Sequence, residues 1–255
     1  MSETEKEPSI NAINRHAFVI FAKAPEPGNV KTRLQPCLAQ DESAELYRNF
    51  ILDTVAMSRK LENTDVYMAC LPSKEHPAFT ELVAGSGIEL IDQRGHDLGE
   101  RMHNVLRYFI LRGYRKSVIV GADSPSLPVD YIEMAYKDLD HKHLVVGPSY
   151  DGGYYLLGAA GISPDIFDQV PWSTMNVFNI TLRKARAEKL EYAVLPYWYD
   201  VDTVRDLHHL YGHLVSICPI GDGVGKNTMN YLKNLIERGR INPDIQAQDQ
   251  CGAVA

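Results

Sequence analysis

The sequence has few cysteines, and they are widely separated. Four occur in 255 residues, and no two of them form a C-x-x-C pair: Cys37, Cys70, Cys218 and Cys251. Zinc knuckles and disulfide-rich frameworks need closer or more numerous cysteines, so neither is indicated. The thiols are typical of a reducing compartment, and we expect the protein to be cytoplasmic.

Positive charge and long apolar runs are also scarce. The 26 Lys and Arg residues are outnumbered by 33 Asp and Glu residues, which gives a formal net charge of -7. Binding to a polyanion through counterion release is therefore disfavoured, and we expect no nucleic-acid partner. No segment approaches the roughly 18 uninterrupted apolar residues of a membrane span. The polar start "MSETEKEPSINAINRH" lacks the apolar core of a signal peptide, so we expect no membrane partner.

Several familiar site motifs are missing. The sequence contains no G-x-x-x-x-G-K-[ST] and no G-x-G-x-x-G, which excludes a P-loop and a Rossmann dinucleotide fingerprint. It has no H-E-x-x-H and no G-x-S-x-G, so a zinc protease or a serine hydrolase lacks support. Any catalytic site must be built from other loops.

Short apolar runs alternate with segments of helical spacing. Helical spacing is found at 44–61, 98–111 and 129–139, and a further helix is expected from about Thr203. The apolar runs, which predict strands, are "AFVIFA" from Ala17, "DVYMACL" from Asp65, "IELI" from Ile88, "SVIVGA" from Ser117, "HLVVGP" from His143 and "EYAVLPYWYDVDT" from Glu191. Strands that are apolar on both faces and alternate with helices predict an α/β three-layer sandwich with a mostly parallel central sheet. We expect a disordered tail at 1–15, one domain at 16–218, and a C-terminal helix and tail at 219–255.

In such sheets, ligands bind beyond the carboxyl ends of the strands. The first strand is followed there by "KAPEPGNVKTRLQP", which places the cations Lys23, Lys31 and Arg33 close together. Cationic side chains on an open backbone suit a diphosphate, although a solvated basic loop is the alternative. "DQRGHDLGERM" carries Gln93, which can read a base edge, and Asp97, which can cap the helix that follows.

Two further strand ends deliver carboxylates. Asp123 follows the strand of "VIVGADSPSLP", where it is placed to hold a divalent ion; its alternative role, capping the helix near Pro128, suits Ser126 better. Asp200 and Asp202 alternate along an extended segment and so point to the same side, which favours a shared cation. Asp202 could also cap the helix from Thr203.

The stretch "VVGPSYDGGYYLLG" places Asp151 on a glycine turn between two apolar runs. The carboxylate either faces a ligand or stabilises the turn. Gly152 and Gly153 would allow a sugar to approach the backbone closely.

Six stretches in order resemble a bacterial family of glycosyltransferase-A-like proteins, first catalogued as a domain of unknown function and often labelled arsenosugar-biosynthesis glycosyltransferase-like. The resemblance covers about 16–214 and rests on "FAKAPEPGNVKTRL", "DQRGHDLGERM", "GADSPSLP", "GPSYDGGYYLLG", "PWSTMNVFNIT" and "DVDTVRDL". It implies the nucleotide-diphospho-sugar transferase (GT-A) fold.

The resemblance also implies roles for individual residues. Asp123 and Asp202 would bind Mg²⁺ or Mn²⁺, and Asp151 would be an acceptor-side or catalytic carboxylate. The remaining acceptor side would comprise Gly152, Gly153, Tyr154, Trp172, Ser173 and Thr174. The nucleotide would be bound by Lys23, Lys31, Arg33, Gln93, Asp97, Gly99, Glu100, Arg101, Gly121, Ala122, Gly147 and Pro148.

Two positions depart from the related pattern. Ser124 stands where the family usually has cysteine, and Cys37 follows Pro36 where sugar nucleotidyltransferases have lysine. The missing lysine weakens the nucleotidyltransferase interpretation, because that group would steady an attacking phosphate.

The sequence therefore predicts a metal-dependent glycosyltransferase with a nucleoside diphosphate sugar donor and a small-molecule acceptor. One alternative is a guanylyltransferase-like nucleotidyltransferase, which would use a nucleoside triphosphate and a phosphorylated small molecule and release pyrophosphate. Another is a non-catalytic nucleotide-binding protein. A homodimer is compatible with the sequence.

Overall fold

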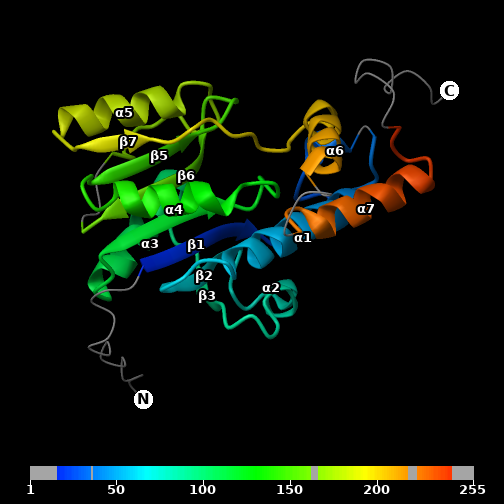
Figure 1. Ribbon diagram of the computed structural model, residues 1–255, viewed down its shortest axis with the longest axis horizontal. Helices are drawn as coiled ribbons and strands as arrows, with labels where there is room; N and C mark the ends of the chain where they lie inside the picture. Colours follow the sequence, from blue (N-terminus) through cyan, green and yellow to red (C-terminus); the bar gives the residue numbers. More distant parts are fainter. Residues whose placement is uncertain (1–15, 36, 162–165, 218–222, 243–255) are drawn as a thin grey trace.

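The computed structural model describes residues 16–35, 37–161, 166–217 and 223–242, and within them one seven-stranded sheet forms the centre of the molecule (Figure 1). The strand order is β3-β2-β1-β4-β6-β5-β7. The strands are β1 (His16–Lys23), β2 (Thr64–Leu71), β3 (Glu89–Asp92), β4 (Lys116–Gly121), β5 (Leu144–Pro148), β6 (Tyr154–Ala160) and β7 (Tyr192–Val194). The predicted 1–15 tail and most of the residues after α7 lie outside the described residues.

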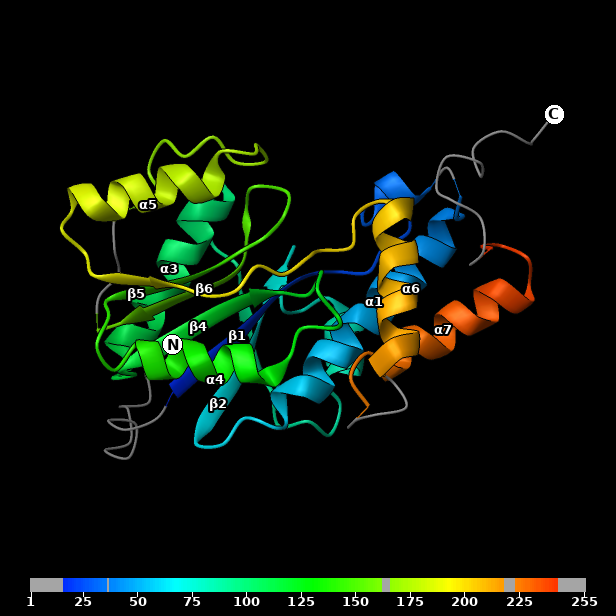
Figure 2. The same ribbon diagram turned by 45° about the horizontal axis from the view of Figure 1, so that its top comes forward.

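Helices cover both faces of the sheet, which confirms the predicted three-layer fold (Figure 2). Along β1 the side chains alternate: Phe18 and Ile20 pack on one face, whereas Val19 and Phe21 pack on the other. The first face is covered by α1 (Gln40–Ser58), α2 (Pro77–Leu82) and α4 (Val129–Asp138), and the second by α3 (Leu98–Leu111) and α5 (Val177–Ala187). Because every central strand is buried on both faces, its sequence reads as a continuous apolar run.

One strand runs against the others. β6 pairs antiparallel with both β4 and β5, while the remaining pairings are parallel. β5 and β6 form a hairpin through the turn at 149–153, and β6 inserts between β4 and β5. The amino end of β6 therefore meets the carboxyl ends of its neighbours at one edge of the sheet.

A small helical layer packs on the outside of α1. It consists of α6 (Val204–Ile217) and α7 (Lys226–Glu237), seen together beside α1 in Figures 1 and 2. The amino end of α7 is held by Asp53 of α1, whose carboxylate accepts hydrogen bonds from the backbone of Asn227 and Thr228 at 2.9 and 2.8 Å. Leu232 and Leu235 of α7 are fully buried in the same core. Within the described residues, no helix is both long and apolar enough to cross a bilayer.

Candidate active site

A cavity of about 460 Å³ opens at the carboxyl edge of the sheet, where the predicted loops meet. It lies over the ends of β1 and β4, the start of β6 and the start of α3. Twelve of the residues predicted to form the site line it: Lys23, Lys31, Gln93, Arg101, Gly121, Asp123, Asp151, Gly153, Tyr154, Trp172, Ser173 and Asp202. The fold thus brings the four strand-end loops together, as expected for a parallel sheet.

The other predicted residues lie outside the lining, and several of them shape it instead. Thr174 donates its hydroxyl to the carbonyl of Pro171 at 2.7 Å, and Arg33 is exposed but approaches Asp202 at 3.7 Å. The remaining residues outside the lining are Asp97, Gly99, Glu100, Ala122, Gly147, Pro148 and Gly152.

Three of these glycines make room for neighbours that close the cavity wall. A methyl group on Gly99 would overlap the indole of Trp172, and one on Gly147 would overlap the ring of Tyr155. Gly152 has φ = 90°, and a methyl group there would overlap the backbone carbonyl of Met175. Glycine at these positions allows close packing rather than direct contact with a ligand.

The hydrogen bonds at the starts of α3 and α6 show whether Asp97 and Asp202 cap these helices. Asp97 caps α3 as predicted, since its side chain accepts from the amide of Glu100 at 2.8 Å. Asp202 does not cap α6: the amides of Asp202 and Thr203 donate to Asp206, at 3.2 and 2.8 Å, and the Thr203 hydroxyl accepts from the Asp206 amide at 3.3 Å. The carboxylate of Asp202 is therefore not used as a helix cap, and it lines the cavity.

The predicted cap of α4 is wrong. The N-cap position is Pro128, and no side chain caps it. Ser126 instead donates its hydroxyl to the hydroxyl of Tyr199 at 2.9 Å, and that hydroxyl is 2.6 Å from Nδ1 of His213. This contact ties the loop that carries Asp123 to the segment that carries Asp200.

Asp123 and Asp202 share one buried cation. The ammonium of Lys31 lies 2.9 Å from Oδ1 of Asp202 and also pairs with Oδ1 of Asp123. The Lys31 side chain is only 3% exposed. Burial tends to lower its pKa, but the two carboxylates outweigh burial and raise it, so the ammonium stays charged.

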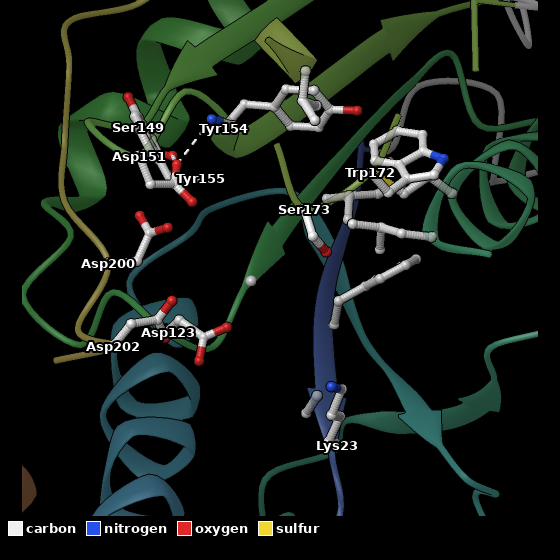
Figure 3. A pocket seen from close by; sticks show the side chains of 18 of the residues that line it. Lys23, Asp123, Ser149, Asp151, Tyr154, Tyr155, Trp172, Ser173, Asp200 and Asp202 are labelled. Atoms are coloured by element: carbon white, nitrogen blue, oxygen red, sulfur yellow. Dashed lines mark hydrogen bonds between the residues drawn. The ribbon is translucent and has the colours of Figure 1, made fainter. Parts of the chain in front are cut away.

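Asp200 completes an acidic cluster, lying between Asp151 and the Asp123–Asp202 pair in Figure 3. Burial raises the pKa of Asp200 to about 8, and the negative charges of Asp151, Asp123 and Asp202 add to the shift. Its Oδ1 is buried without a hydrogen-bond partner. An orphaned buried carboxylate next to other carboxylates is a place where a cation would be stabilised.

The donor chemistry of this cluster fits Mg²⁺ or Mn²⁺, which prefer carboxylate oxygens. Within the described part of the chain, however, no group of three or more Asp, Glu, His or Cys side chains is already arranged around a metal position. The Lys31 ammonium lies between the two predicted ligands. The cluster thus has suitable ligands, but a lysine holds two of them together.

Asp151 serves the turn and also faces the cavity. Its Oδ1 accepts from the hydroxyl of Ser149 and from the amide of Gly153, the latter at 2.8 Å. This is the turn-stabilising role considered for the sequence. Because Asp151 also lines the cavity, its second oxygen can contact a ligand, and the two roles are compatible.

Gln93 is more constrained than the sequence suggests. Its amide nitrogen donates to the carbonyls of Ala22 and Ala69, at 3.1 and 2.8 Å, and so ties the ends of β1 and β2 together. Only the amide oxygen is left for a ligand, so Gln93 can accept a hydrogen bond in the cavity but not donate one.

Sequence reasoning did not assign some of the lining residues. Asp200 had a visible signal, its alternation with Asp202, which favoured a shared cation, but only Asp202 was named as a metal ligand. Tyr47 had none, because it lies on α1; its hydroxyl accepts from the amide of Lys23 at 3.1 Å. Ser149 and Asn29 lie on predicted loops but carried no distinctive pattern.

Comparison with known proteins gives a family and a fold. A family model described as "Uncharacterized protein conserved in bacteria (DUF2064)" matches residues 54–174. The solved structure of a "putative nucleotide-diphospho-sugar transferase" from Desulfovibrio desulfuricans G20 is 34% identical, with a TM-score of 0.78. The match covers 89% of this chain and 99% of that one. No curated protein matches the sequence.

More distant structures share the fold alone. CMP:2-keto-3-deoxy-manno-octonic acid synthetase, solved in complex with CTP, is 11% identical with a TM-score of 0.52, over 80% of this chain and 99% of that one. The 4-diphosphocytidyl-2C-methyl-D-erythritol synthase of Anaerococcus prevotii DSM 20548 is 9% identical with a TM-score of 0.54, over 81% of this chain and 100% of that one.

Proposed function

Because the chain belongs to the DUF2064 family and has the nucleotide-diphospho-sugar transferase fold, we propose that it is a metal-dependent glycosyltransferase, which uses a nucleoside diphosphate sugar and a small-molecule acceptor. The observation that carries the proposal is the cavity at the carboxyl edge, where cationic side chains lie opposite a cluster of carboxylates. The cationic side chains suit a diphosphate, and the carboxylates suit a metal cation and an acceptor hydroxyl.

The nucleotide would occupy the end of the cavity near β1 and α3. Lys23 and Arg101 supply positive charge there, and the amide oxygen of Gln93 can accept a hydrogen bond from a base. Cations fixed near the diphosphate would stabilise the charge that develops on the leaving nucleotide.

Asp123, Asp200 and Asp202 would hold Mg²⁺ or Mn²⁺. When bound, the metal would neutralise charge on the diphosphate. The chain's own contribution is the position of the carboxylates, which is fixed by short contacts between loops: the amide of Val201 donates to the carbonyl of Asp123 at 3.0 Å.

The acceptor would lie beside the turn at 149–153, against Trp172 and Ser173. Asp151 would orient an acceptor hydroxyl and accept its proton as a general base. Its bonds to Ser149 and Gly153 use one oxygen and fix the carboxylate in place, so the other oxygen is presented in a defined direction.

The test is to incubate the full chain with a panel of nucleoside diphosphate sugars and nucleoside triphosphates plus Mn²⁺, with pooled small-molecule acceptors. Glycosyl transfer releases a nucleoside diphosphate, and we expect this product. Release of pyrophosphate instead would establish nucleotidyl transfer and refute the proposal. Nucleotide binding by calorimetry without either product would indicate a binding protein.

Matched variants localise the activity. Asp123→Asn should abolish turnover, because it removes one negative charge from the cation-binding end of the cavity. Asp130→Asn makes the same chemical change on the exposed first turn of α4, outside the cavity, and should leave turnover unchanged. Equal turnover of the two variants would refute the assigned site.

A further inference from the structure

Lys31 differs from a typical phosphate-binding lysine, because its ammonium group is buried against two carboxylates. Its backbone is left-handed, with φ = 48° and ψ = 39°, a conformation that costs a non-glycine residue about 1–3 kcal/mol. Its side chain points inward, away from solvent, to the two carboxylates at the acidic end of the cavity. The fold therefore fixes this ammonium between Asp123 and Asp202.

Aromatic rings as well as carboxylates surround the ammonium group of Lys31. The Nζ atom lies 5.7 Å from the ring centre of Tyr47 and 5.6 Å from that of Phe50. Both rings belong to α1 and are buried. Ring faces attract cations, so this pocket is suited to a positive charge even before the carboxylates are counted.

The lysine and a divalent metal would use the same oxygens. Oδ1 of Asp123 and Oδ1 of Asp202 both contact Nζ, and these carboxylates are the proposed metal ligands. A second cation at the pair must either displace the ammonium or bind beside its positive charge, and either event weakens metal binding. Lys31 forms its ion pairs with Asp123 and Asp202, and the buried Oδ1 of Asp200 has no hydrogen-bond partner among the described residues.

We infer that Lys31 is a built-in counter-ion of the Asp123–Asp202 pair and that it lowers the affinity of this pair for divalent metal. The inference rests on the metal site of the proposed function. Lys31 is thus a positioning residue: it keeps the two loops together and the carboxylates paired when no metal is bound, and it competes with the metal that binds there.

The test is direct titration of the metal-free full chain with Mn²⁺, with bound ion measured by the loss of the free Mn²⁺ resonance signal. In Lys31→Met we expect the Kd for Mn²⁺ to fall about tenfold or more relative to the wild type. Lys23→Met removes a lysine from the same cavity that acts on Asp202 from a distance and is not ion-paired with it, so its Kd should change less than threefold. An unchanged or higher Kd in Lys31→Met overturns the inference.

Thermal unfolding provides a second readout that does not depend on turnover. In EDTA, Lys31→Met should unfold at a lower temperature than the wild type, because the two half-exposed carboxylates lose the cation between them. Mn²⁺ should restore its stability more than it raises that of the wild type. The double variant Lys31→Met with Asp202→Asn restores the charge balance, so it should be more stable in EDTA than the single variant and should lose the gain in Mn²⁺ affinity.

The double variant keeps the test decisive if Lys31→Met folds only in the presence of Mn²⁺. In that case, folding of the double variant in EDTA supports the counter-ion role, and its failure to fold overturns it. The proposed function fails separately: turnover that persists in EDTA refutes metal dependence. Equal Mn²⁺ affinity in wild type and Lys31→Met, together with metal-dependent turnover, refutes only the inference.

Discussion

Replacing Asp200 by asparagine should make the metal-free protein more stable. Asp200 is partly buried, its Oδ1 is fully buried without a hydrogen-bond partner, and three other carboxylates lie close enough to disfavour its ionised form. Asparagine has a similar shape but cannot ionise, so the variant removes the cost of keeping a carboxyl in this position. A residue that destabilises the fold where it stands is a strong candidate for a functional role.

The size of the stability gain in Asp200→Asn and its dependence on pH follow from the pKa of Asp200. The pKa of Asp200 is about 8 in the folded chain, against about 3.9 in an unfolded one. A raised folded-state pKa contributes stability that is complete at low pH and lost as pH rises from about 4 to about 8. At pH 7 the difference of about three pH units between the pH and the unfolded pKa corresponds to about 4 kcal/mol. For a chain of this size, that free energy would raise Tm by roughly 10 °C.

The assay is thermal unfolding of wild type and Asp200→Asn in EDTA, at pH values from 4 to 8. The two curves should nearly coincide at pH 4 and separate progressively up to pH 8. Asp202→Asn is the matched control with the opposite sign, because the ion pair with Lys31 lowers the pKa of Asp202 against the effect of burial. Adding Mn²⁺ should stabilise the wild type more than Asp200→Asn. A pH-independent difference, or a less stable Asp200→Asn at pH 7, would refute the reasoning.

Three other substitutions test parts of the fold that support the site. Glu42→Gln weakens the hydrogen bonds from Arg240, which lower the pKa of Glu42, so it should cost about 1–2 kcal/mol at pH 7 in urea unfolding, and the loss should shrink below pH 4. Gly152→Ala forces a methyl group against the carbonyl of Met175 at positive φ, so Tm should fall by the equivalent of about 1–3 kcal/mol, and turnover should fall with it. Tyr199→Phe removes the hydroxyl that links the loop before α4 to α6; urea unfolding should show a loss of about 1–2 kcal/mol, and unchanged stability would mean that the link is not formed.

The central sheet could be predicted because burial on both faces leaves a simple mark on the sequence. The runs at β1, β2, β4 and β5 are apolar without interruption, and the helix at Leu98–Leu111 has its predicted bounds. The strand β6 was not predicted, although an apolar run was noted after Asp151, and its direction could not be predicted either. An apolar strand has the same composition whether it runs parallel or antiparallel, and its position between β4 and β5 depends on contacts far apart in the sequence. The expected late strand from Glu191 is also shorter than its apolar run, ending at Val194.

The composition of the site was easier to predict than its connections. Carboxyl ends of parallel strands meet at one edge, so the placement of Asp123, Asp151 and Asp202 around one cavity follows from the fold class. The pairing of Lys31 with Asp202 joins residues 171 positions apart, and no local pattern indicates it. The cap at Thr203 could not be told from a cap at Asp202, because both residue types accept hydrogen bonds from helix amides.

The carboxylates of this cavity lower the stability of the unliganded fold. We expect a bound ligand to offset that loss of stability. Lys31 neutralises Asp123 and Asp202 only in part, and Asp200 has no hydrogen bond on its buried oxygen. A fold selected for stability alone would place an uncharged side chain at position 200, since burying an unpaired carboxyl costs several kcal/mol, on the order of 4 at pH 7. We expect a positive charge that enters the cavity to offset this energetic cost at neutral pH. Under the proposed function, a cationic ligand, brought as a free metal ion or together with a nucleotide diphosphate, would offset this cost, and Lys31 would reduce it for as long as that ligand is absent.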